Sequence, residues 1–196
     1  MRDRTQRALC VLDSLLVLYS VLLAWRPLDE ADTFFHLSLG RAVLRAGSRV
    51  VPEPTAFADF TQPAVASEWL WSVLSYAAYS GGWLALSLLG CALAGLAAYV
   101  QLRCIRSWAP PELGPWLTSA VCVLTLCVVQ CRVAVRPELA LLIGLPLFMH
   151  GCRAYAAAAL PRRMQIGLAL ALGSVLWAQL HASFVLSPAL FVLLVA

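Results

Sequence analysis

The chain has 196 residues, of which 62% are apolar and only 12% are charged, and its formal net charge is +4. A soluble globular domain carries about 25% charged residues, so a folded surface that faces water on every side is hard to build from this sequence. These numbers argue against a soluble enzyme and exclude a disordered chain, a collagen and a coiled coil. They predict an all-α integral membrane protein.

A helix needs about 20 apolar residues to cross the bilayer. The first apolar run, 8–25, follows three arginines and is interpreted as an uncleaved N-terminal signal anchor over 1–25. Residues 26–82 then predict an outer loop with interfacial helices, because the apolar run 69–80 is too short to span. The later runs, all within 83–196, are 83–102, 116–131, 138–152, 165–180 and 184–196.

These runs predict one membrane domain over 1–196, a polytopic transmembrane bundle of about six spans. The last run stops at Ala196 without a flanking charge, so we expect the chain to be truncated at its C-terminus.

The arginines predict the orientation of the bundle, because basic residues collect on the cytoplasmic side. All 14 basic residues are Arg. A cytoplasmic N-terminus places eight of them inside and six outside, where most of the acidic residues also lie. The inner set is Arg2, Arg4, Arg7, Arg103, Arg106, Arg153, Arg162 and Arg163. The first loop, 132–138 and 179–181 then reach the same outer face, which is where we expect a functional site.

The first candidate residues open an amphipathic segment that runs to about residue 46. Asp29, Asp32 and His36 are three and four residues apart, so a helix would place them on one face. Asp32 is then a general base or a metal-binding carboxylate beside His36. The alternative is a helix N-cap, worth about 1 kcal/mol, next to an interfacial histidine. Residues 47–54 predict a turn that leaves this helix.

Three further groups of polar residues fall on the predicted outer face. Glu68 precedes Trp69 and Trp71, which predicts a first-turn carboxylate favoured by the helix dipole and an interfacial aromatic pair. Arg132 and Arg136 are either snorkelling side chains or a phosphate clamp. His181, which follows Gln179 at the end of a span, is either an interfacial residue or points into a cavity shared with Asp32. Asp13 is expected to reach the interface or a neighbouring helix.

The sequence lacks the motifs of several other catalytic chemistries. The chain has no Walker loop, HExxH, GxSxG or Cys/His metal spacing. The spacing of possible ligands does not indicate a divalent metal, and the sequence does not identify a cofactor. Polar residues collect at one face rather than along a path through the bilayer, which argues against a transporter. The distribution of the arginines between the two membrane faces is explained by the positive-inside rule, so no nucleic-acid partner is expected.

The outer-face pieces occur in a familiar order. Residues 29–37 read DEADTFFHL and are followed by Gly40-Arg41, Glu68-Trp69-Leu70, Arg136-Pro137-Glu138-Leu139 and a 176–181 piece, LWAQLH. This set resembles bacterial multi-spanning membrane glycosyltransferase-like proteins of the GT-C class, whose first outer loop reads roughly D-x-D-x-W-W-H-L-x-x-G. Here Phe34-Phe35 stands in place of the Trp pair. The resemblance covers about residues 25–190.

The resemblance implies a membrane glycosyltransferase, or the N-terminal half of one. Its fold is then a helical bundle in the bacterial cytoplasmic membrane, with the active site facing outward. The donor is then a sugar on a polyprenyl phosphate and the acceptor belongs to the envelope. It implies a catalytic role for Asp32, with Asp29 as second choice, and phosphate binding by Arg132 or Arg136. His36, Glu68 and His181 are the remaining substrate-binding candidates. Because such proteins have about twice as many spans, a protein partner that supplies the missing spans is also implied. The alternative is a non-catalytic scaffold or partner subunit in envelope polysaccharide assembly.

Overall fold

The computed structural model describes residues 2–26, 31–52, 63–129 and 135–195. Within these ranges the fold is all-α, as predicted, apart from two short antiparallel strands, β1 (Val50–Pro52) and β2 (Pro63–Val65). The helices are α1 (Arg2–Ala24), α2 (Ala31–Ala46), α3 (Trp69–Tyr79), α4 (Trp83–Trp108), α5 (Gly114–Val129), α6 (Glu138–Ala157), α7 (Leu160–Leu180) and α8 (Leu186–Val195). Short 3-10 turns, Pro111–Leu113 and Ala182–Val185, precede α5 and α8.

Three of the described helices are long and apolar enough to cross a membrane. They are α1 from Arg4 onward, α4 and α6, and each contains one of the predicted spans. The other predicted spans are also helical, as α5, α7 and α8, but α5 and the segment Ala182–Val195 are shorter apolar helices. The predicted interfacial segment 69–80 is the 11-residue helix α3. These lengths indicate a membrane protein.

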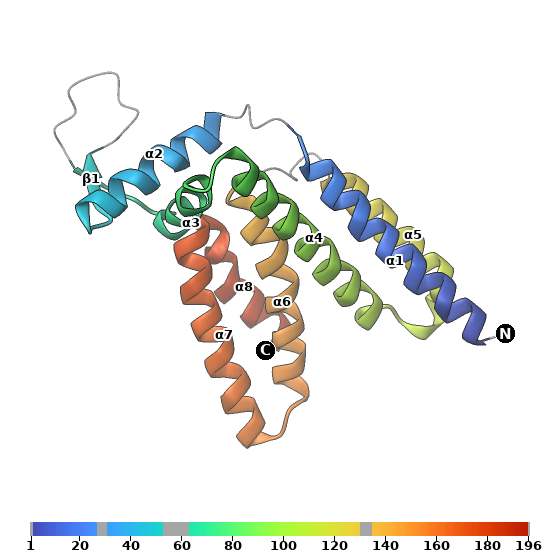
Figure 1. The fold of residues 1–196 in the computed structure, drawn as a ribbon. Coiled ribbons are helices and arrows are strands. Elements are labelled where there is room, and N and C mark those ends of the chain that lie inside the picture. The colour runs from blue at the N-terminus through green and yellow to red at the C-terminus, as the bar shows by residue number, and fades with distance from the viewer. Residues whose placement is uncertain (1, 27–30, 53–62, 130–134, 196) are drawn as a thin grey trace.

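The helices form two groups that meet at one end (Figure 1). Helix α4 packs against α1 and α5 on one side and against α6 on the other, while α6 also contacts α7 and α8. Helices α2 and α3 pack extensively on each other and lie across the end where α1 ends and where α4 and α6 begin. The segments that sequence analysis assigned to one membrane face are therefore neighbours in space.

Helices α2 and α3 approach so closely because of one glycine. A Cβ atom placed on Gly40 would lie 2.1 Å from the backbone oxygen of Ser72 in α3. No side chain fits at that distance. The contact brings the backbone of α2 against α3 one turn after His36, and so it sets the separation of the polar residues on these two helices.

The segment after α2 differs from the predicted turn over residues 47–54. Gly47 has a φ of 61° and ends the helix as expected. Val50 and Val51, however, extend into β1, which pairs with β2. Val51 is buried against Leu39 and Val43 of α2. Two β-branched residues at a half-buried edge favour a strand over an open turn, and their partner strand is too remote in the sequence for local pattern to predict it.

A charged pair joins the helices at the end of the molecule remote from α2. Arg106 of α4 donates through Nε to Asp13 Oδ2 at 2.6 Å and through Nη2 to Asp13 Oδ1. The same Nη2 lies 3.3 Å from Ser119 Oγ of α5. Asp13 therefore reaches a neighbouring helix, as predicted, and the pair links α1, α4 and α5.

Candidate functional site

Polar residues from four separate segments meet beside α2 and α3. They comprise two residues of α2, one residue before α3, one before α6 and one after α7. All were predicted site residues: Asp32, His36, Glu68, Arg136 and His181. The other two predicted residues, Asp29 and Arg132, lie outside the described residues. The structure divides the five into two ionic groups, the pair Asp32–Arg136 and the trio His36–Glu68–His181, which are described in turn.

The first contact joins α2 to the segment before α6. Arg136 Nε lies 3.7 Å from Asp32 Oδ2, and the Asp32 side chain is 60% exposed whereas that of Arg136 is 24% exposed. Next to it, Thr33 Oγ1 donates to the backbone oxygen of Val135 at 3.3 Å. Arg136 is therefore held against α2. Asp32, in the first turn of α2, keeps an exposed carboxylate beside a guanidinium.

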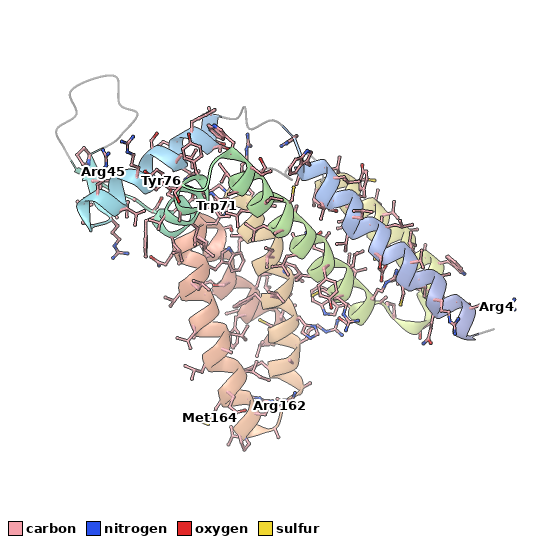
Figure 2. The ribbon with its side chains drawn as sticks, viewed as in Figure 1. Arg4, Arg45, Trp71, Tyr76, Arg162 and Met164 are labelled. Atoms are coloured by element: carbon pink, nitrogen blue, oxygen red, sulfur yellow. The ribbon has the colours of Figure 1, made fainter. Side chains whose placement is uncertain are left out.

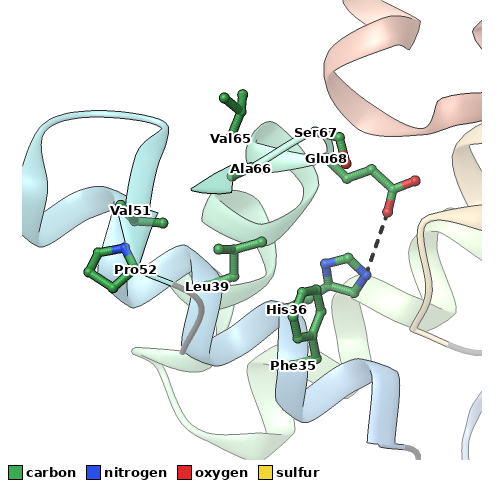
Figure 3. Close-up of a pocket in the computed structure, with 9 residues that line it drawn as sticks. All are labelled: Phe35, His36, Leu39, Val51, Pro52, Val65, Ala66, Ser67 and Glu68. Atoms are coloured by element: carbon green, nitrogen blue, oxygen red, sulfur yellow. Dashed lines mark ion pairs between the residues drawn. The ribbon is translucent and has the colours of Figure 1, made fainter. Parts of the chain in front are cut away.

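The second contact is built around a buried histidine. The His36 side chain is only 8% exposed. Its Nδ1 lies 2.9 Å from Ser72 Oγ of α3, and its Nε2 lies 3.7 Å from Glu68 Oε2. Figure 3 shows the His36 ring and the Glu68 carboxylate facing each other across the small cavity that both residues line.

Glu68 occupies the N-cap position of α3 but makes no side-chain capping bond. Its Oε1 instead accepts the backbone N–H of Ala182 at 3.1 Å and lies 4.0 Å from His181 Nε2. Glu68 therefore stands at the N-terminus of α3, one residue before the predicted first turn, and its side chain bonds across to the end of α7. Glu68 stands between two imidazoles and joins the start of α3 to the end of α7.

The end of α7 is shaped by a residue that leaves the helical conformation. His181 has an extended backbone, with φ −159° and ψ 141°. Its Nδ1 accepts the backbone N–H of Ser183 at 3.0 Å and lies 2.6 Å from Ser183 Oγ. His181 therefore faces Glu68, and no contact between His181 and Asp32 occurs in the described part of the chain. Trp69 Nε1 donates to Gln179 Oε1 at 2.6 Å, a second tie between α3 and α7.

Burial lowers the pKa of His36 below its ordinary value of 6.5. The negative charges of Glu68, Asp32 and Glu138 act in the opposite direction, and His181 adds a smaller lowering effect. Because loss of hydration dominates, the imidazole of His36 is neutral at pH 7. A neutral histidine beside a carboxylate can accept a proton.

Two cavities adjoin these residues. The smaller, of about 160 Å³, is lined by Phe35, His36, Leu39, Val51, Pro52, Val65, Ala66, Ser67 and Glu68. The larger, of about 620 Å³, lies between α3, α4, α6 and α7 and is almost wholly apolar. None of the five polar residues lines it. Trp71 and Leu180, which do, stand three residues after Glu68 and one residue before His181, so the large cavity begins within one helical turn of the ionic site along the chain.

Trp71 was predicted to belong to an interfacial aromatic pair, but its side chain does not face the surroundings of the protein. Trp71 is buried, at 3% exposure, and forms part of the wall of the large cavity. Trp177 of α7 is buried on the same wall. The indole N–H groups of both tryptophans have no hydrogen-bond partner within the described ranges.

Sequence reasoning missed three residues that position the site, namely Thr33, Ser72 and Gln179. Ser72 lies four residues after Glu68 and thus on the same face of a helix, which was an available signal. Thr33 and Gln179 form hydrogen bonds with residues about a hundred positions away in the sequence. Among the residues that the structure describes, no group of three or more His, Cys, Asp or Glu is arranged to hold a metal ion.

Comparison with protein-family models, with curated proteins and with solved structures gives no match. The resemblance to glycosyltransferase-like membrane proteins therefore stays a prediction, and the function is argued from the site.

Proposed function

We propose that the protein is a membrane glycosyltransferase that moves a sugar from a polyprenyl phosphate to an envelope acceptor. The observation that carries this proposal is the juxtaposition of an ionic site with a large apolar cavity. The cavity suits a prenyl chain, and the ionic site suits a phosphate and a reacting hydroxyl.

The large cavity supports a lipid-linked donor. Its volume falls within the range of about 300–1,000 Å³ that is common for ligand sites. Leu74, Leu147 and Leu176 on its wall are each about half exposed, so the cavity is open toward the surroundings of the helices. The unpartnered N–H groups of Trp71 and Trp177 add to the argument. A buried donor without a partner costs about 1–3 kcal/mol, and an oxygen of a bound headgroup would remove that cost.

Arg136 is the described residue best suited to hold the phosphate. A guanidinium matches phosphate oxygens in shape and charge. Arg136 is already held beside Asp32. The carboxylate of Asp32 alone would repel a phosphate, and the positive charge of Arg136 offsets that repulsion. Phosphate binding would therefore release Asp32 to orient the hydroxyl of the acceptor.

The chemistry we assign is an inverting displacement at the anomeric carbon. The acceptor oxygen forms a bond to that carbon, the bond to the phosphate oxygen breaks, and the polyprenyl phosphate leaves with the electron pair. The acceptor hydroxyl loses its proton to a base of the protein. The leaving group is already good, so positioning and neutralisation of its charge supply most of the acceleration.

The arginines support an outward-facing site in the bacterial cytoplasmic membrane. Arg4 and Arg162 lie at helix ends remote from α2 and α3, whereas Arg45 lies at the end of α2 (Figure 2). Under the positive-inside rule the remote ends are cytoplasmic. The site then faces outward, and α1, α4, α5, α6, α7 and α8 would supply the six predicted spans.

The experiment that tests this function is binding of undecaprenyl phosphate to the purified protein in detergent. We expect saturable binding, weakened about 10-fold to 100-fold by Arg136→Ala, because a charged hydrogen bond to phosphate is worth about 1.5–3 kcal/mol. Asp32→Asn is expected to spare binding, and Arg45→Ala serves as the matched arginine control. Absence of binding, or binding that Arg136→Ala leaves unchanged, would favour the non-catalytic scaffold.

A further inference from the structure

Ser72 Oγ links His36 to the start of α3. It lies 3.1 Å from the backbone oxygen of Glu68, to which it can donate, and 2.9 Å from His36 Nδ1. When the hydroxyl hydrogen goes to Glu68, Ser72 accepts from Nδ1–H. In that tautomer the lone pair of the neutral ring is on Nε2, the nitrogen that faces Glu68.

The neighbouring histidine has the opposite tautomer. His181 Nδ1 accepts the backbone N–H of Ser183, so its ring hydrogen is on Nε2 and points toward Glu68 Oε1. Glu68 therefore has a donor on the His181 side and the backbone donor of Ala182. On the His36 side it meets only a lone pair, at 3.7 Å.

This gap between two hydrogen-bond acceptors borders a cavity. His36 and Glu68 both line the 160 Å³ cavity, together with the ring of Phe35 and with Ser67 (Figure 3). A hydroxyl group that enters the cavity could donate its hydrogen to the lone pair on Nε2.

We propose that His36 Nε2 is the base that takes the proton from the acceptor hydroxyl, with Glu68 stabilising the imidazolium and Ser72 fixing the tautomer. The inference rests on the proposed function and deepens it. The O–H bond of the acceptor breaks as its oxygen attacks the anomeric carbon. The proton goes to His36 Nε2, the phosphate leaves with the electron pair, and the imidazolium donates to Glu68 until water removes the proton. Asp32 keeps the orienting role.

The groups that face His36 define the pH dependence. They are Asp32 on its own helix, Glu68 before α3, Glu138 of α6 and His181 after α7. A base must be neutral to act, so the rate rises with pH through the pKa of His36, which lies below 6.5. The rate at pH 7 then exceeds half of its maximum, because His36 is mostly neutral there. Because the charge of Glu68 raises this pKa, Glu68→Gln moves the acid limb to lower pH.

The test combines turnover with a direct measurement of the tautomer. Turnover is followed as release of undecaprenyl phosphate from its glucose, mannose and arabinose conjugates by the full chain in liposomes, with water or added glycerol as the acceptor hydroxyl. His36→Asn keeps a donor toward Ser72 but lacks the base, so kcat is expected to fall about 100-fold and the acid limb to disappear, with binding of undecaprenyl phosphate unchanged. His150→Asn, at an exposed histidine of α6, is the matched control.

The two proposals fail in different ways. Turnover by His36→Asn at the wild-type rate, with the same pH profile, would overturn the role of His36 and leave the glycosyltransferase intact. So would ring ¹⁵N spectra that show the hydrogen of neutral His36 on Nε2, because that nitrogen would then be a donor. Absence of turnover of all three conjugates by the wild-type protein would remove the proposed function, and the role of His36 with it.

Discussion

Replacement of Arg106 by Met is expected to lower the free energy of unfolding by about 3 kcal/mol. The change leaves the carboxylate of Asp13 without the guanidinium that now donates to both of its oxygens. Both side chains are mostly buried, with exposures of 21% and 28%, so water does not replace the lost partner. Asp13→Leu should cost less, because the remaining arginine is long enough to reach solvent. Unfolding in detergent, followed by circular dichroism, measures both effects.

The double variant Asp13→Leu/Arg106→Met provides the decisive comparison. Removal of both charges leaves no unpaired group, so most of the stability lost in Arg106→Met is expected to return. Arg103→Met is the control, because Arg103 is an exposed arginine of the same helix. A double variant whose loss equals the sum of the two single losses would show that the pair contributes no coupling energy.

Replacement of Gly40 by Ala is expected to affect both the fold and the site. The new methyl group would meet the backbone oxygen of Ser72 at 2.1 Å, and helix backbone cannot move aside as a flexible side chain can. Forced separation of α2 from α3 is expected to cost about 3 kcal/mol of unfolding free energy. It would also pull Ser72 away from His36, so turnover should fall even in the molecules that remain folded.

Gly173→Ala is the matched control for this prediction. A Cβ on Gly173, in the middle of α7, has no atom within 4 Å, so the change is expected to be neutral or to stabilise by up to about 1 kcal/mol. Equal thermal stability of the Gly40→Ala and wild-type proteins would mean that α2 and α3 are not in contact at this glycine.

The sequence predicted the helices, and it predicted that the site residues gather at one end of them, because both follow from local composition. An apolar run of sufficient length predicts a helix in a membrane, and counting such runs assigns alternate loops to alternate faces. That counting brought Asp32, Arg136 and His181 to the same face, although more than a hundred residues separate the first from the others.

The pairing within the site could not be predicted in the same way. Glu68 was expected to interact with the dipole of its own helix. Its contacts with His36 and Ala182 depend instead on how α2, α3 and α7 pack. The burial of Trp71 likewise depends on α7 covering α3. Packing between elements that are distant in sequence leaves no periodic signal in either one. The β1–β2 pair was missed for the same reason.

The proposed activity of the site is transfer of a sugar from a polyprenyl phosphate, and turnover of the three undecaprenyl-phosphate conjugates by purified wild-type protein and by Asp32→Asn tests it. Both proteins should first be shown to have the same thermal stability. We expect release of undecaprenyl phosphate from at least one conjugate by the wild type, and a rate at least about 10-fold lower for Asp32→Asn. Wild-type turnover by Asp32→Asn, or no turnover by either protein, would overturn the proposed activity.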